Sequence, residues 1–141
     1  MLIMQGFCAV YSNSNHDLDW SNVGSLMSGN LTDERNGHSL SLSSDGTRLI
    51  CCGANSSIVG QRSGVARIYD FGGDDWKQVD DDFFLAEGAA FGSSVSMSND
   101  GAFVAVGAPN FTANVIKNEG DVKIFGDLER AQLLGEVEAQ W

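Results

Sequence analysis

Residues 91–109 read FGSSVSMSNDGAFVAVGAP, and this stretch decides the fold. Its first part alternates serine with Val95 and Met97, which is the period of a β-strand with two unlike faces. Asn99-Asp100-Gly101 then supplies a tight turn, because glycine adopts a positive φ at little cost. The following run, 103–106, is apolar throughout, which is typical of a strand covered on both faces. The stretch therefore predicts an antiparallel hairpin.

The same pattern occurs a second time, nearer the N-terminus. Gly37–Gly46 reads GHSLSLSSDG and matches Gly92–Gly101, which reads GSSVSMSNDG. A second block, GVARIY at 64–69, returns as GDVKIF at 120–125, and GFCAVY at 6–11 is a third copy. The copies lie about 55 residues apart, so the chain is predicted to be a repeat protein.

Each repeat unit is predicted to hold four short antiparallel strands. The first two form the hairpin, and in the earlier unit the second strand is the apolar run Leu49–Cys52. The third strand carries Arg67 or Lys123 in an outward-facing position, and a fourth, weaker strand begins at Trp20 and at Trp76. Such units bury their apolar faces only by stacking on one another. Four short antiparallel strands in about 50–60 residues are typical of a β-propeller blade.

Composition favours the same all-β class. The 141 residues are enough for one domain. Aspartate outnumbers glutamate 13 to 6 and glycine occurs 17 times, which favours turns and loops over helices. Helical periodicity is limited to Asp127–Ala139, a candidate short helix. The net charge of −11 would repel nucleic acid, and no apolar run is long enough for membrane insertion, so neither is expected as a partner.

Phe91-Gly92, followed by Gly107-Ala108-Pro109, resembles the FG-GAP repeat of integrin α-subunit propellers and related surface proteins. The earlier unit is a degraded copy, with Asn36-Gly37 and Gly53-Ala54-Asn55 at the two positions. The resemblance covers nearly the whole chain. It implies a partial β-propeller of about two and a half four-stranded antiparallel blades. A WD-repeat-like or TolB-like propeller, which also uses a Ser-x-Asp-Gly turn between strands, would have the same architecture.

On this interpretation residues 1–141 form a single repeat domain. Residues 1–35 are the end of a preceding blade and its outer strand, 36–80 an FG-GAP-like blade, and 81–141 an FG-GAP blade with a degraded last strand. Residues 1–10 run directly into a repeat strand and lack the positively charged start of a signal peptide. We therefore expect the chain to be a portion of a longer array.

No residue is predicted to be catalytic, to bind a cofactor or to hold a metal. Integrin-type repeats often carry a calcium loop between their first two strands, and calcium needs about six to eight oxygen ligands. Here the turns that follow Leu42 and Met97 are only four residues long, and each has a single carboxylate, Asp45 or Asp100. These units are therefore expected to be metal-free.

The remaining polar and sulfur-containing residues favour structural roles. The acidic runs 74–75 and 80–82 are interpreted as solvated loops, because adjacent side chains on an extended chain point in alternate directions. The histidines, His16 and His38, form no Ser-His-Asp or Cys-His arrangement. The odd number of cysteines prevents complete pairing within the chain. All three are predicted to be small apolar strand residues: Cys8, Cys51 and Cys52.

Three sequons are candidate N-glycosylation sites, at Asn30, Asn55 and Asn110. Asn55 and Asn110 hold equivalent positions after the second strand of their units, where the repeat predicts a surface loop. The three sequons are candidate glycosylation sites only if the protein is secreted.

The leading functional hypothesis is a non-catalytic binding or adhesion-type propeller module of a surface or secreted protein, hence extracellular or at the cell surface. Further blades or a second copy are also expected partners, because the end sheets of a partial array leave apolar faces uncovered. The alternatives are a non-catalytic structural portion of a secreted propeller hydrolase, and a WD- or TolB-like intracellular interaction propeller. A protein or glycan ligand would bind at the blade-end loops: Leu26–Asn36, Asn55–Ser63, Asp81–Ala90 and Asn110–Glu119.

Overall fold

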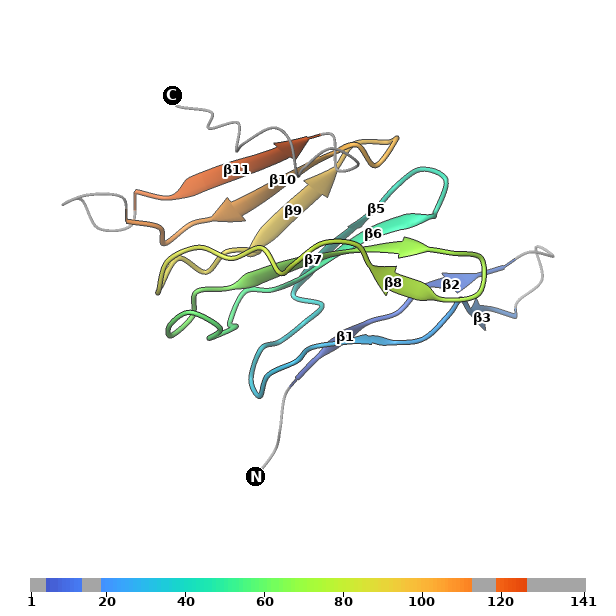
Figure 1. Cartoon of the computed structure of the whole chain (residues 1–141), viewed down its shortest axis with the longest axis horizontal. Coiled ribbons are helices and arrows are strands. Elements are labelled where there is room, and N and C mark those ends of the chain that lie inside the picture. The colour runs from blue at the N-terminus through green and yellow to red at the C-terminus, as the bar shows by residue number, and fades with distance from the viewer. Residues whose placement is uncertain (1–4, 14–18, 113–118, 127–141) are drawn as a thin grey trace.

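The computed structural model describes residues 5–13, 19–112 and 119–126, and every helix or strand assigned in these ranges is a β-strand. The predicted all-β class is confirmed. Neighbouring strands pair in antiparallel fashion within small sheets, which stack face to face in layers (Figure 1). The strands are β1 (Phe7–Cys8), β2 (Tyr11–Ser12), β3 (Ser21–Asn22), β4 (Met27–Ser28), β5 (Ser39–Leu42), β6 (Arg48–Gly53), β7 (Val65–Phe71), β8 (Trp76–Gln78), β9 (Ser94–Met97), β10 (Phe103–Ala108) and β11 (Asp121–Gly126).

Three layers follow one another along the chain. The N-terminal layer consists of two short pairs, β1 with β4 and β2 with β3. The middle sheet is the four-stranded meander β5-β6-β7-β8, and the C-terminal sheet has the order β11-β10-β9. The candidate helix at Asp127–Ala139 and the degraded last strand lie outside the described residues.

The two predicted hairpins form as expected, and their turns use the same chemistry. Between β5 and β6, the Asp45 carboxylate accepts hydrogen bonds from the Ser43 hydroxyl at 2.6 Å and the Thr47 N–H at 3.0 Å, and Gly46 has φ 74°. Asp100 repeats these contacts between β9 and β10, where Gly101 has φ 72°. In each turn the aspartate carboxylate thus accepts the hydrogen bonds of groups that have no partner in the strand pairing.

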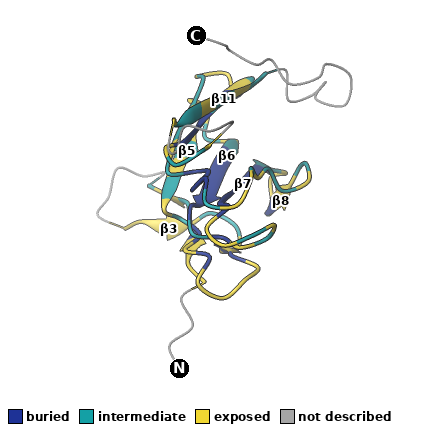
Figure 2. Ribbon diagram, turned by 90° about the vertical axis from the view of Figure 1, so that its left-hand side faces the viewer, coloured by how far each residue is buried: buried dark blue, intermediate teal, exposed yellow. Residues whose placement is uncertain are grey.

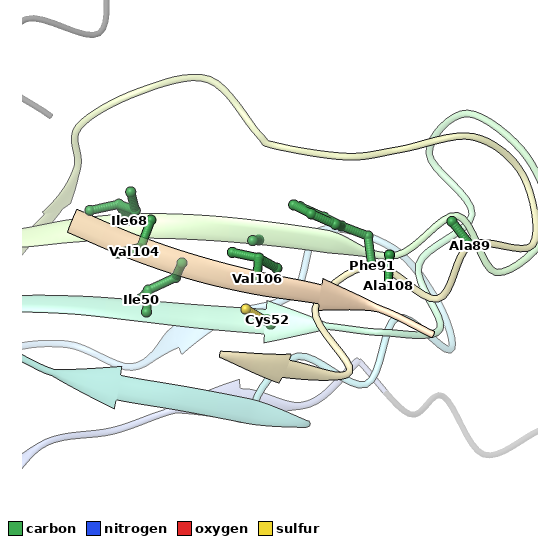
Figure 3. Close-up of a cluster of buried hydrophobic side chains, with 9 residues drawn as sticks. Ile50, Cys52, Ile68, Ala89, Phe91, Val104, Val106 and Ala108 are labelled. Atoms are coloured by element: carbon green, nitrogen blue, oxygen red, sulfur yellow. The ribbon is translucent and has the colours of Figure 1, made fainter. Parts of the chain in front are cut away.

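The apolar core lies in the two spaces between the layers. In β6, Leu49 and Cys51 face the N-terminal layer, whereas Ile50 and Cys52 face the C-terminal sheet (Figure 3). The prediction that the second strand of each unit is covered on both faces is confirmed for β6 but wrong for β10, where Phe103 is 53% exposed on the face turned away from the middle sheet. Strands β6 and β7 form the buried centre of the molecule (Figure 2). The first core cluster comprises Cys8, Met27, Leu49, Cys51, Tyr69 and Trp76. The second comprises Ile50, Cys52, Ala66, Ile68, Ala89, Phe91, Val104, Val106 and Ala108.

Strand β5 alternates as predicted, but its serines rather than its leucines face the neighbouring layer. Ser39 donates a hydrogen bond to the carbonyl of Gly92 at 2.7 Å, and Ser41 accepts one from the N–H of Met97 at 3.1 Å. Leu40 and Leu42 are exposed on the opposite face. The cause is the layering: β5 lies beside β9, whereas the N-terminal layer packs its core residues against β6, β7 and β8.

The cysteine prediction is wrong for two of the three residues. Cys8 on β1 and Cys51 on β6 form a disulfide that joins the N-terminal layer to the middle sheet, with 6.4 Å between their Cα atoms. Cys52 is free and buried on the other face of β6. In the next interface the equivalent positions are Ala66 and Val106, which share one core cluster. The repeat therefore places Cys8 and Cys51 at one contact between layers. The apolar residues at the equivalent positions of the next interface gave no sign of a disulfide.

The FG-GAP-like residues have direct packing roles. Phe91 is fully buried between the middle and C-terminal sheets. Gly92 has φ 84°, and a Cβ there would stand 2.7 Å from the Cβ of Cys52, so no larger residue fits. In the earlier unit Asn36 replaces the phenylalanine and remains buried by donating its amide to the carbonyl of Met27 at 2.8 Å.

Candidate functional site

Three of the four loops predicted to bind a ligand gather at one end of the layers, shown at the left of Figure 1. They are residues 26–36, 55–63 and 81–90, called here the loop end. The fourth, 110–119, falls partly outside the described residues. The aspartate turns of the two hairpins lie at the opposite end, called here the turn end (Figure 1).

Hydrogen bonds join these loops to one another. The Asn55 side-chain amide donates to the carbonyl of Asp33 at 2.8 Å, which links the first loop to the second. Backbone bonds link the second loop to the third, from Gly88 N–H to the Gln61 carbonyl at 2.8 Å and from Ala90 N–H to the Arg62 carbonyl at 2.9 Å. The three loops consequently form one continuous surface.

A buried ion-pair cluster lies beneath this surface. Arg67 of β7 binds Asp82 through two bonds, from Nε at 2.8 Å and from Nη2 at 2.7 Å, and also donates to the Glu34 carboxylate. Neither Arg67 nor Glu34 has any exposed side-chain surface. The prediction that Arg67 faces outward is therefore wrong, because its side chain turns towards the N-terminal layer and pairs with carboxylates from two different loops. One guanidinium thus fastens the first loop and the third loop to the middle sheet.

The electrostatics of the cluster favour the charged forms. Burial lowers the pKa of Arg67, but hydrogen bonds to Asp82 and Glu34 outweigh burial, so this pKa lies above its ordinary value. Burial raises the pKa of Asp82, and the bonds from Arg67 and Gln78 reverse that effect and hold it below its usual range. Glu34 also accepts the backbone N–H groups of Asn30 and Leu31, at 3.0 and 3.1 Å.

The loop surface combines apolar, cationic and strained residues. Leu31, Val59 and Phe84 are exposed apolar side chains, one from each loop. Arg35 of the first loop and Arg62 of the second are exposed as well, and both have positive φ, 57° and 54°. Non-glycine residues in this backbone region cost free energy, and such strain is concentrated at functional sites. Aromatic and arginine side chains are also enriched in the centres of protein interfaces.

The sequon residues have different environments. Asn30 is exposed. Asn55 is half-buried and its amide nitrogen is already used in the bond to Asp33. Asn110 is half-buried, and its backbone N–H donates to the carbonyl of Ala89 at 3.3 Å.

The remaining candidates do not assemble into a reactive site within the described residues. The acidic run 80–82 contributes one carboxylate, Asp82, to the Arg67 cluster, whereas Asp81 is exposed. His38 is exposed, and His16 lies outside the described ranges. The described part of the chain contains no group of three or more His, Cys, Asp or Glu side chains able to hold a metal ion. Among the same residues no helix is long and apolar enough to cross a membrane.

Sequence reasoning missed the Glu34–Arg67–Asp82 cluster. The available signal was Arg67 itself, a single cation inside the otherwise apolar run 65–69. A cation in such a strand needs carboxylates nearby, and acidic residues occur in both flanking loops. The repeat concealed this requirement, because Lys123, which holds the same position, is paired within its own strand, with Asp121 at 3.4 Å; its side chain is 16% exposed, so the outward-facing prediction is wrong for Lys123 as well.

Comparison with known proteins adds no family. No family model matches the chain, and no curated protein matches it. The FG-GAP resemblance accordingly rests on the residues of the repeat alone.

Proposed function

We propose that the chain is a non-catalytic binding module, part of a β-propeller of the FG-GAP kind, that recognises a protein or glycan through its loop end. The observation that carries the proposal is the union of three loops into one surface above the buried Arg67 cluster. A surface held in this way needs little ordering when a ligand binds, which favours affinity.

The propeller interpretation is supported by the layering. The middle sheet is a four-stranded antiparallel meander in chain order, as in a blade, and it packs face to face against a sheet on each side. On this proposal the two short pairs of the N-terminal layer are the counterparts of β7 and β8, and β9–β11 are the counterparts of β5–β7.

An extracellular or cell-surface location is supported by the Cys8–Cys51 disulfide, since such bonds persist mainly in oxidising compartments. The exposed sequon at Asn30 agrees with the same compartment. The disulfide also argues against the intracellular WD- or TolB-like alternative.

The test is binding of the labelled protein to a printed glycan array and to a panel of immobilised cell-surface glycoproteins. We expect wild-type protein to bind at least one probe, and Phe84→Asp or Arg62→Glu to weaken that binding tenfold or more. Asn99→Lys, at the exposed turn end, is the matched control and should bind as wild type does. Absence of binding to every probe, or equal binding by all variants, would contradict the proposal.

A further inference from the structure

The chain carries three copies of one packing element, and among the described residues only the middle copy is packed on both sides. Each copy has a pair of apolar residues, two positions apart, on the side that faces the following layer. Each also has an aromatic residue on the opposite side, which in the second and third copies faces the preceding layer. The pairs are Cys8 with Val10, Ala66 with Ile68, and Val122 with Ile124. The aromatic residues are Tyr11, Tyr69 and Phe125.

Both internal interfaces use this element in the same way. Between the N-terminal layer and the middle sheet, Cys8 and Val10 share a core cluster with Tyr69. Between the middle and C-terminal sheets, Ala66 and Ile68 share the other cluster with Phe125. Each interface therefore joins one apolar pair to one aromatic side chain from the next layer.

Within the described ranges, one apolar pair and one aromatic residue take no part in either core cluster, and they lie at opposite ends of the layers. Val122 and Ile124 on β11 are 52% and 39% exposed, and Tyr11 on β2 is 55% exposed. Trp20 follows the same rule: its repeat equivalent, Trp76, is 7% exposed in the interface, whereas Trp20 is 68% exposed. The two exposed faces therefore carry the repeat equivalents of side chains that pack against each other inside the molecule.

We propose that a second copy of this chain binds head to tail, with its Tyr11–Trp20 face against the Val122–Ile124 face of the first. The occupant is a second copy because the matching face is present on this chain and continues an interface that the fold already repeats twice. The contact is heterologous, so it generates a ring if the rotation closes and an open chain of copies if it does not. This inference rests on the layer geometry alone, and the loop end plays no part in it.

Charge sets the conditions for assembly. The net charge of −11 makes the copies repel one another. Salt screens this repulsion at separations beyond about 8 Å at physiological ionic strength, whereas burial of the apolar faces remains favourable. Association should therefore increase from low to moderate salt.

A complementation experiment tests the polarity of the contact. Ile124→Asp blocks the tail face only, and Tyr11→Asp blocks the head face only. Light scattering after size exclusion should give wild-type protein at a multiple of the 15.0 kDa chain mass and each variant at 15.0 kDa. An equimolar mixture of the two variants should form a two-chain particle, because each retains the face that the other lacks.

Phe84→Asp, which changes an exposed aromatic residue at the loop end, is the matched control and should assemble as wild type does. Circular dichroism melting of the variants verifies that each remains folded. A monomeric wild type, a variant that assembles unchanged, or a mixture that stays monomeric would each overturn the proposal. Loss of glycan or glycoprotein binding would leave it unaffected, so this proposal and the proposed function fail separately.

Discussion

Arg67 and Glu34 form an ion pair from which solvent is excluded, since neither side chain has exposed surface. The pair connects a strand of the middle sheet to the loop that precedes β5. Asp82 adds a second carboxylate from the loop that follows β8, so the cluster couples both loops to one guanidinium. Removing the cation would leave two carboxylates facing each other in a poorly solvated space.

Arg67→Met should therefore destabilise the protein strongly, by about 3–5 kcal/mol, the usual cost of removing one partner of a buried pair. Urea unfolding followed by tryptophan fluorescence measures the loss. Arg48→Met is the comparison: Arg48 makes two bonds to Asp70 and one to the Gly101 carbonyl, but Asp70 is 36% exposed and would be rehydrated, so the loss should be smaller. Similar losses of unfolding free energy for the two variants would show that the Arg67 cluster does not hold the two loops to the middle sheet.

The disulfide predicts a specific thiol count and a stability change. Denatured, unreduced protein should react with one equivalent of an alkylating reagent, at Cys52, and reduced protein with three. The bond closes a loop with a sequence separation of 43, so reduction should lower the free energy of unfolding by about 4 kcal/mol on the chain-entropy model. Three reactive thiols without reductant would contradict the pairing.

Val104 tests the position of the core. It lies 1% exposed between the middle and C-terminal sheets, so Val104→Asp would bury an unpaired carboxylate. The expected cost of several kcal/mol, against a total stability of about 5–15 kcal/mol, should prevent folding. Asp100→Asn, in the neighbouring exposed turn, keeps an acceptor oxygen and loses only the charge that strengthens the turn bonds, so its loss of stability should be small beside that of Val104→Asp. Equal solubility and stability of the two variants would contradict this placement.

Local patterns in the sequence were sufficient for the strands but not for the contacts between layers. The alternation around Val95 and the turn at Asp45 predict both hairpins, because strand period and turn chemistry are local properties. The partners of Arg67 lie in two loops and the partner of Cys8 lies in another layer, whereas a repeat compares each residue only with its own copy. The exposure of Leu40 and Leu42 in β5 has the same origin, because which face of that strand is covered depends on the neighbouring layer.

The sequons predict unequal glycosylation. When the protein is expressed through a secretory pathway, we expect Asn30 to carry a glycan, because its side chain is exposed. Asn55 should remain unmodified or nearly so, since its half-buried amide nitrogen lies against the Asp33 carbonyl and is poorly accessible for attachment of a sugar. Mass spectrometry of Asn30→Gln should show loss of one glycan, whereas Asn55→Gln should match wild type. A fully occupied Asn55 would contradict the prediction.

Acid sensitivity should come partly from the aspartate turns. Hydrogen bonds from Ser43 and Thr47 lower the pKa of Asp45 from 3.8 to about 2 in the folded protein. A depressed pKa contributes stability that is fully present above the unfolded value and is lost as pH falls towards the folded value. The contribution of Asp45 should therefore disappear between about pH 4 and pH 2.

Thermal unfolding of wild type and Asp45→Asn from pH 6 to pH 2 measures this effect. The wild type should be more stable at pH 6, because asparagine carries no negative charge to strengthen the bonds from Ser43 and Thr47. That advantage should shrink as the carboxylate is protonated, until the two proteins melt alike near pH 2. Asp74→Asn, at an exposed position in the β7–β8 turn, is the control and should track the wild type. A difference between wild type and Asp45→Asn that stays constant over this range would show that the turn carboxylate is not the group that titrates.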